Sequence, residues 1–134
     1  MILADTSGLL SLYNRREPTH PPVAEAVEQE RGPYVVSPYV VAELDYLVAT
    51  RLGADAEQRV LAELASPAYV LATIDRDDLR ACAELISRYP GIGVTDASML
   101  VLADRLGIDR VLTLDRRHFE VVRTPSGRAL AIVP

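Results

Sequence analysis

The sequence predicts an α/β fold in which helices cover both faces of a parallel sheet. Short apolar runs have the length and composition of strands that are buried on both faces. Segments with helical signals separate these runs, and this alternation is typical of a three-layer α/β/α sandwich. The 134 residues contain no repeat, linker or low-complexity tract, so we expect a single domain over residues 1–134.

Four to five strands are expected in this sheet. The central one is the N-terminal run Ile2-Leu3-Ala4, which ends at once in the carboxylate of Asp5. Turn and capping residues bound the other runs, as is usual for short buried strands. The expected strands cover residues 2–4, 34–36, 68–73, 111–114 and 129–133.

Seven helices are expected between and after these strands. Ser7 and Thr95 are the expected N-caps of the first and sixth helices, and Ser37 followed by Pro38 begins the third. Gly107 is expected to end the sixth helix. The third and fourth helices follow each other closely and should form a helical hairpin. The expected helices cover residues 8–13, 19–30, 38–51, 54–64, 75–89, 96–106 and 116–120.

The composition excludes several classes of protein. The longest apolar runs are far shorter than the ~20 residues of a membrane span, and Asp5 interrupts any signal-peptide core. Cys82 is the single cysteine, so it has no partner for a disulfide or zinc site and is expected to be buried. We therefore expect a cytoplasmic protein with no membrane contact. The net charge of −5 is unusual for a nucleic-acid binder, although all 14 basic residues are arginine.

Four acidic residues are expected to meet at one edge of the sheet. Asp5 and Asp115 follow strands, Glu43 lies in the helix after the second strand, and Asp96 begins the helix before the fourth. In a parallel sheet these positions share the carboxyl edge. Two carboxylates about 4 Å apart repel by ~4 kcal/mol at an effective dielectric constant of 20. A bound cation would relieve this repulsion. Hard oxygen ligands without cysteine favour Mg²⁺, and Mn²⁺ is a possible substitute.

Three of the four acids also have an ordinary structural explanation. Asp96 fits a first-turn acid that the helix dipole favours, and Asp115 fits a turn residue after a strand. Glu43 has apolar helix neighbours and no arginine within one turn, so it needs solvent, a distant arginine or a metal as its partner. The metal hypothesis therefore depends on all four acids together.

Four segments resemble the acidic motifs of a known family. They are residues 5–7 (Asp-Thr-Ser), 41–44 (Val-Ala-Glu-Leu), 95–97 (Thr-Asp-Ala) and 112–119 (Leu-Thr-Leu-Asp-Arg-Arg-His-Phe). In this order they resemble the motifs of PIN-domain ribonucleases, and the chain length and layout resemble the VapC toxins of type II toxin–antitoxin pairs. The resemblance implies strand order 3-2-1-4-5, a homodimer and Mg²⁺-dependent endonucleolytic cleavage of RNA, either transfer or ribosomal RNA. It also implies inhibition by a VapB-type antitoxin.

The expected chemistry is metal-assisted hydrolysis of a phosphodiester. Asp5, Glu43 and Asp96 would hold one Mg²⁺, and Asp115 would complete a second site or orient the attacking water. Hydroxyl side chains beside the acids are expected to fix the carboxylates, with helix capping as the alternative for two of them. These hydroxyl residues are Thr6, Ser7, Thr95 and Thr113. The arginines expected to contact RNA phosphates, unless they are solvated loop charges, are Arg116, Arg117 and Arg15.

Several neighbouring residues are expected to have no part in the chemistry. His20 is interpreted as a surface residue at a helix start and His118 as a local contact. Asp45 lies ~200° around the helix from Glu43, so both cannot face one metal, and Asp45 is assigned to a subunit or antitoxin contact. Asp104 is interpreted as a surface acid. The apolar stretch 39–49 is expected to provide a surface for the antitoxin or for a second subunit.

Three other functions are compatible with an acid at a strand end. A phosphoacceptor receiver domain needs a lysine on its last strand, and the chain has none. A haloacid-dehalogenase-type phosphatase needs a second aspartate two residues after Asp5, where Ser7 stands. A catalytically silent interaction module on the same fold remains the alternative, and it would bind a partner without Mg²⁺-dependent cleavage.

Overall fold

Five short strands form one parallel sheet in the computed structural model, which describes residues 1–134. The strands are β1 (Ile2–Ala4), β2 (Tyr34–Val36), β3 (Tyr69–Leu71), β4 (Arg110–Leu112) and β5 (Ala131–Val133). Their order is β3-β2-β1-β4-β5, and every neighbouring pair is parallel. The expected order 3-2-1-4-5 is therefore confirmed, with five strands.

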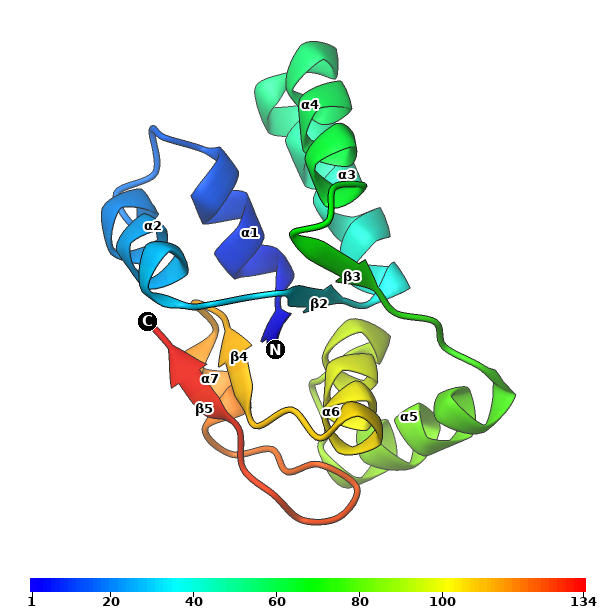
Figure 1. Ribbon diagram of the computed structural model, residues 1–134. Coiled ribbons are helices and arrows are strands. Elements are labelled where there is room, and N and C mark those ends of the chain that lie inside the picture. Colours follow the sequence, from blue (N-terminus) through cyan, green and yellow to red (C-terminus); the bar gives the residue numbers. More distant parts are fainter.

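Seven helices cover the two faces of this sheet. They are α1 (Thr6–Tyr13), α2 (His20–Gln29), α3 (Pro38–Leu52), α4 (Ala54–Leu64), α5 (Arg76–Arg88), α6 (Val94–Leu106) and α7 (Arg116–Phe119). Figure 1 shows α1, α2 and α4 on one side of the sheet and α5 and α6 on the other, which confirms the three-layer sandwich. Helices α3 and α4 pack against each other as the expected hairpin. None of the helices combines the length and the apolar composition needed to cross a membrane.

Strand β1 lies at the centre of the sheet and of the core. Its three residues are at most 1% exposed, as expected for a parallel strand covered on both faces. Gly8, in the first turn of α1, lies so close to β4 that an added Cβ would stand 2.8 Å from the carbonyl oxygen of Leu112. This close contact fixes the start of α1 beside the carboxyl ends of β1 and β4.

Two of the expected helix caps are wrong. Ser7 lies inside the first turn of α1, and the N-cap is Asp5. Thr95 lies inside α6, and the N-cap is Gly93. In both cases the hydroxyl donates to a carboxylate from another position instead of capping its own helix. Both helices therefore begin two residues earlier than expected, and this brings their first turns to the carboxyl edge of the sheet.

Other boundaries follow the expected signals. Ser37 caps α3 by accepting a hydrogen bond from the N–H of Tyr39, and Gly107 ends α6 in the left-handed conformation with a φ of 67°. The last strand and the third strand are shorter than expected, because only three residues of each pair with the neighbouring strand.

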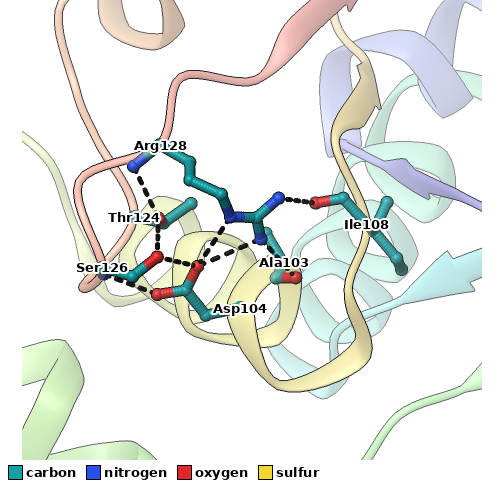
Figure 2. Close-up of polar contacts among 6 residues, drawn as sticks. All are labelled: Ala103, Asp104, Ile108, Thr124, Ser126 and Arg128. Carbon is teal, nitrogen blue, oxygen red and sulfur yellow. Dashed lines mark hydrogen bonds and ion pairs between the residues drawn. The ribbon is translucent and has the colours of Figure 1, made fainter.

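A polar cluster fastens the loop before β5 to the last turn of α6 (Figure 2). Arg128 donates from Nε and Nη2 to Oδ1 of Asp104, at 3.2 and 3.0 Å, and Nη2 also donates to the carbonyl of Ala103 at 3.0 Å. Ser126 donates to the same carboxylate through its hydroxyl at 2.7 Å and its main-chain N–H at 2.6 Å. Asp104 is therefore a structural anchor, and its interpretation as a simple surface acid is wrong.

Candidate active site

The four acids line one pocket of about 360 Å³ at the carboxyl edge of the sheet. Asp5 follows β1 directly, and Asp115 is the N-cap of α7, just beyond β4. Glu43 lies in the second turn of α3, and Asp96 lies in the first turn of α6. Four elements far apart in the sequence thus contribute one carboxylate each. We call this the acid pocket.

Asp5 is the most enclosed of the four acids and is only 5% exposed. Its Oδ2 accepts hydrogen bonds from the hydroxyls of Ser7 and Thr113, each at 2.7 Å. Its main-chain N–H donates to the carbonyl of Leu112 at 2.9 Å, which ties the residue to the end of β4. The carboxylate is therefore held in one orientation from two sides.

The two hydroxyls that fix Asp5 also fix the loop that carries Asp115. Ser7 Oγ accepts from the main-chain N–H of Leu114 at 2.9 Å, and Thr113 Oγ1 accepts from that of Asp115 at 3.0 Å. The hydroxyl oxygens of Ser7 and Thr113 are 3.2 Å apart. Ser7 and Thr113 thus join the start of α1 to the loop after β4, and they couple the positions of two acids.

Thr95 and Thr6 occupy different environments in the pocket. Thr95 Oγ1 donates to Oε2 of Glu43 at 3.1 Å, which links α6 to α3. Thr6 lines the pocket at 3% exposure, and its buried hydroxyl oxygen has no hydrogen-bond partner. Glu43 itself is exposed, so it meets the pocket solvent and is not desolvated by its apolar helix neighbours.

His118 lies between two of the acids, a position that sequence reasoning missed. Its Nδ1 is 3.0 Å from Oδ2 of Asp115 and 3.2 Å from Oδ2 of Asp96. The sequence places it three residues after Asp115, and the single turn of α7 then directs it back into the pocket. His118 is therefore a member of the site and not merely a local contact.

The pocket concentrates negative charge around Asp96. Burial raises the pKa of Asp96 to about 6, and the neighbouring charges of Asp5 and Asp115 act in the same direction. The proximity of His118 lowers the pKa and only partly offsets these effects. The folded chain thus holds a carboxylate whose ionised form is poorly stabilised by protein groups alone.

The donor chemistry of the pocket fits a hard divalent cation. All four acids offer carboxylate oxygens, Oδ1 of Asp5 has no protein donor, and burial together with the charges of Asp5 and Asp115 disfavours the ionised form of Asp96 in the absence of a cation. No three acidic, histidine or cysteine side chains stand close enough to form a ready-made ligand cluster. The acids therefore share one pocket without already having the spacing of a closed metal site.

The expected RNA-contacting arginines lie outside the acid pocket. Arg116 donates to the main-chain carbonyl of Pro134 at 2.5 Å, and Arg117 is exposed without an ion pair. Arg15 lines a different pocket, beside α1, α3 and α4. The arginine that does line the acid pocket is Arg51, at the end of α3, which sequence reasoning did not select.

His20 and Asp45 both contact neighbouring helices of the chain. His20 is joined through Nδ1 to the carbonyl of Ser11 at 2.9 Å, so it ties α2 to α1. Asp45 lies near α4, where its neighbouring carboxylate raises the pKa of Glu57. Asp45 is outside the acid pocket, in agreement with its angular separation from Glu43.

Comparison with known proteins identifies the family. Residues 2–124 match the model of the PIN domain. Ribonuclease VapC26 from Mycobacterium tuberculosis (strain ATCC 25618 / H37Rv) is 45% identical over 135 residues, which cover 99% of this chain and 100% of that protein.

Solved structures show the same fold at low sequence identity. VapC20 from Mycobacterium tuberculosis, described as a sarcin–ricin loop cleaving toxin, aligns with a TM-score of 0.80 at 20% identity, over 86% of this chain and 90% of that one. A toxin–antitoxin complex from Klebsiella pneumoniae aligns with a TM-score of 0.74 at 19% identity, over 100% and 97%. From the PIN-domain match and the full-length identity to a VapC ribonuclease, the chain belongs to the PIN-domain family and, within it, to the VapC ribonucleases.

Proposed function

We propose that this VapC ribonuclease hydrolyses RNA in the acid pocket with the help of a divalent cation, and that it is the toxin of a toxin–antitoxin pair. The observation that best supports the mechanism is that carboxylates from four elements line one pocket, where burial and the charges of Asp5 and Asp115 raise the pKa of Asp96 to about 6. The relative VapC26 is named a ribonuclease. The silent-module alternative has no observation in its favour.

The four acids have two different parts in the proposed mechanism. Asp5, Glu43 and Asp96 would hold Mg²⁺, with Mn²⁺ as a substitute, and Asp115 would complete a second site or orient the attacking water. The bound ion would lower the pKa of water and neutralise charge on the phosphate. The water oxygen forms a bond to phosphorus, the bond from phosphorus to one ribose oxygen breaks, and that oxygen gains a proton. His118, whose Nδ1 lies 3.2 Å or less from both carboxylates, would help to position Asp96 and Asp115.

The supporting hydroxyls would keep the pocket in place during this reaction. Ser7 and Thr113 hold Asp5, and Thr95 holds Glu43. Second-layer hydrogen bonds of this kind orient metal ligands, and their loss commonly lowers metal affinity about 10- to 100-fold. The unpartnered hydroxyl of Thr6 is available to a water or to substrate.

The test compares Asp5→Asn with Asp77→Asn, an exposed acid on α5 that pairs only with Arg80. Total RNA is incubated with each protein in Mg²⁺, in Mn²⁺ and in EDTA. We expect cleavage by the unchanged chain and by Asp77→Asn only with metal, and loss of cleavage by Asp5→Asn of about 100-fold or more. Equal cleavage in EDTA, or full activity of Asp5→Asn, would overturn the mechanism. No cleavage by any protein would favour the silent module.

The RNA substrate is proposed to be a transfer RNA or a ribosomal RNA loop in the cytoplasm. The family resemblance supports this class. Mapping of new 5′ ends on total RNA after induced expression would identify the cleaved molecule. Cuts confined to messenger RNA would exclude both structured substrates.

A VapB-type antitoxin and a second copy of the chain are the proposed protein partners. A toxin–antitoxin complex is among the structures with this fold. Tyr46 on α3 is 69% exposed, which fits the expected partner surface along this helix. Size-exclusion chromatography with light scattering, with and without the co-expressed antitoxin, tests both partners. A monomer under both conditions would contradict the proposal.

A further inference from the structure

A second pocket, of about 580 Å³, adjoins the acid pocket and has the opposite charge. It lies where the end of α1 meets the α3–α4 hairpin, and α1 packs directly against α3 (Figure 1). Eight residues line it, and none of them is acidic. Four of the eight are arginines, namely Arg15, Arg16, Arg51 and Arg59. We call this the arginine pocket.

None of the four arginines is neutralised by the rest of the chain. Their guanidinium groups form no ion pair and no hydrogen bond with protein atoms, and all four residues are exposed. Other arginines of the chain are engaged. Arg105 pairs with Asp78, and Arg110 pairs with Glu30. In a chain with a net charge of −5, four free guanidinium groups in one pocket are a marked local excess of positive charge.

Local helix geometry explains how the fold tolerates these arginines. Arg51 lies in the last turn of α3, and Arg15 and Arg16 follow the end of α1. The partial negative charge of a helix C-terminus favours cations, but it is worth less than about 1 kcal/mol at an exposed site. The helix C-termini therefore favour arginine at these positions without neutralising the guanidinium charges. The guanidinium groups remain available to an anion.

Arg51 connects the two pockets because it lines both of them. The acid pocket alone repels a polyanion, since it holds four carboxylates. Affinity for a phosphodiester chain must then come from cations beside the acids. Arginines are suited to this because their planar groups donate two parallel hydrogen bonds to one phosphate. The arginine pocket supplies such cations within one continuous surface.

We propose that the arginine pocket binds phosphates of the RNA strand next to the bond that is cleaved. In this arrangement Arg51 contacts the phosphate nearest the acids, and Arg15, Arg16 and Arg59 contact phosphates further along the strand. The identification of the polyanion as RNA rests on the proposed function. The pocket assigns the strand a path over α1, α3 and α4, away from Arg116 and Arg117.

The test measures RNA binding without cleavage. A short fluorescein-labelled oligouridine is titrated with the full chain in EDTA at several salt concentrations. We expect Arg51→Gln/Arg59→Gln to weaken binding by about 10-fold or more and to reduce the salt slope by about 1.4, since each contact to a single strand contributes ~0.7. The matched control is Arg31→Gln/Arg88→Gln, which removes two exposed arginines outside both pockets and should change neither quantity.

Two further measurements make the result decisive. Arg51→Lys/Arg59→Lys keeps the charges and should keep the salt slope, and loss of the slope in this variant would contradict a charge contact. A short oligoglutamate peptide serves as a competing ligand. Unchanged RNA binding in Arg51→Gln/Arg59→Gln would overturn the proposal. If Arg51→Gln/Arg59→Gln loses as much affinity for the peptide as for RNA, or more, the proposal is overturned in favour of an acidic protein segment.

Cleavage in Mg²⁺ by the unchanged chain is assayed in parallel. Absence of cleavage would count against the ribonuclease mechanism, whereas unchanged binding in EDTA would count only against the arginine pocket. The two failures are thus distinguishable.

Discussion

The two ends of helix α6 hold two aspartates with opposite environments. Asp96 lies in the first turn and Asp104 in the last, ~12 Å apart along the helix axis. Asp104 accepts hydrogen bonds from Arg128 and Ser126 (Figure 2). Burial acts to raise the pKa of Asp104, but these hydrogen bonds outweigh burial and lower it. The pKa of Asp96 is instead raised to about 6.

This difference separates a carboxylate that serves folding from one that serves function. At the C-terminal end of α6, Arg128 and Ser126 donate hydrogen bonds to the Asp104 carboxylate, so the chain itself stabilises this charge. At the N-terminal end it places two further acids beside Asp96 and only one imidazole. A fold selected for stability alone would not collect unpaired acids in this way. The proposed cation would supply the positive charge that the chain places at Asp96 only through His118.

The largest expected effect is the loss of activity in Asp96→Asn. The amide cannot supply the negative charge that a cation needs, so we expect RNA cleavage to fall by about 100-fold or more. Asp104→Asn should keep most of the activity, because Asp104 lies outside the acid pocket. Cleavage rates of the two variants on the same RNA provide the measurement. A similar loss in both would show that the two ends of α6 are not functionally distinct.

The fold was predictable because its signals are local. Short apolar runs, the Ser37-Pro38 helix start and the Gly107 stop all act within a few residues. The shared position of the acids followed from topology, since the carboxyl ends of parallel strands lie at one edge. The roles of Ser7 and Thr95 were less predictable, because capping and carboxylate binding use the same residue types.

The remaining differences arise from contacts between distant segments. Arg128 reaches Asp104 from 24 positions away, and Arg51 joins two pockets only after α3 packs beside α1. His118 enters the site because α7 is a single turn that points back toward α6. No periodicity or spacing in the sequence predicts these contacts directly. They follow from tertiary packing.

A smaller effect is expected from removing the partner of Asp104. Arg128→Gln should lower the free energy of unfolding by about 1–2 kcal/mol. The Asp104 carboxylate loses a charged hydrogen-bond donor, and the Ala103 carbonyl loses the donor that Arg128 provides. The expected effect is modest because the Arg128 side chain is 40% exposed, so solvent screens its ion pair with Asp104. Urea unfolding measures the change, and Arg123→Gln, whose guanidinium contacts only nearby main-chain carbonyls, is the control. Stability equal to that of the control would mean that the cluster in Figure 2 does not anchor the loop.

The smallest expected effects are those of pH on the metal-free chain in EDTA. The folded-state pKa of Asp96 is about 6 against an ordinary value of 3.8, so the folded state binds the extra proton between these values. Stability attributable to Asp96 is therefore present below pH 3.8 and is lost as the pH rises to 6. The pKa of Asp104 is lowered, so its stabilising contribution is present above 3.8 and is lost as the pH falls through the folded-state value.

The measurement is the free energy of unfolding of each asparagine variant, subtracted from that of the unchanged chain. Plotted against pH, the two differences should have opposite slopes. We expect Asp96→Asn to gain stability relative to the unchanged chain between pH 4 and pH 6, where the deprotonated aspartate becomes costly. We expect the deficit of Asp104→Asn to shrink below pH 3.8, where its advantage over asparagine disappears. Slopes of the same sign in both variants would contradict the assignment of one aspartate to folding and the other to function. Because neither slope depends on RNA, this comparison tests the electrostatics of α6 independently of catalysis.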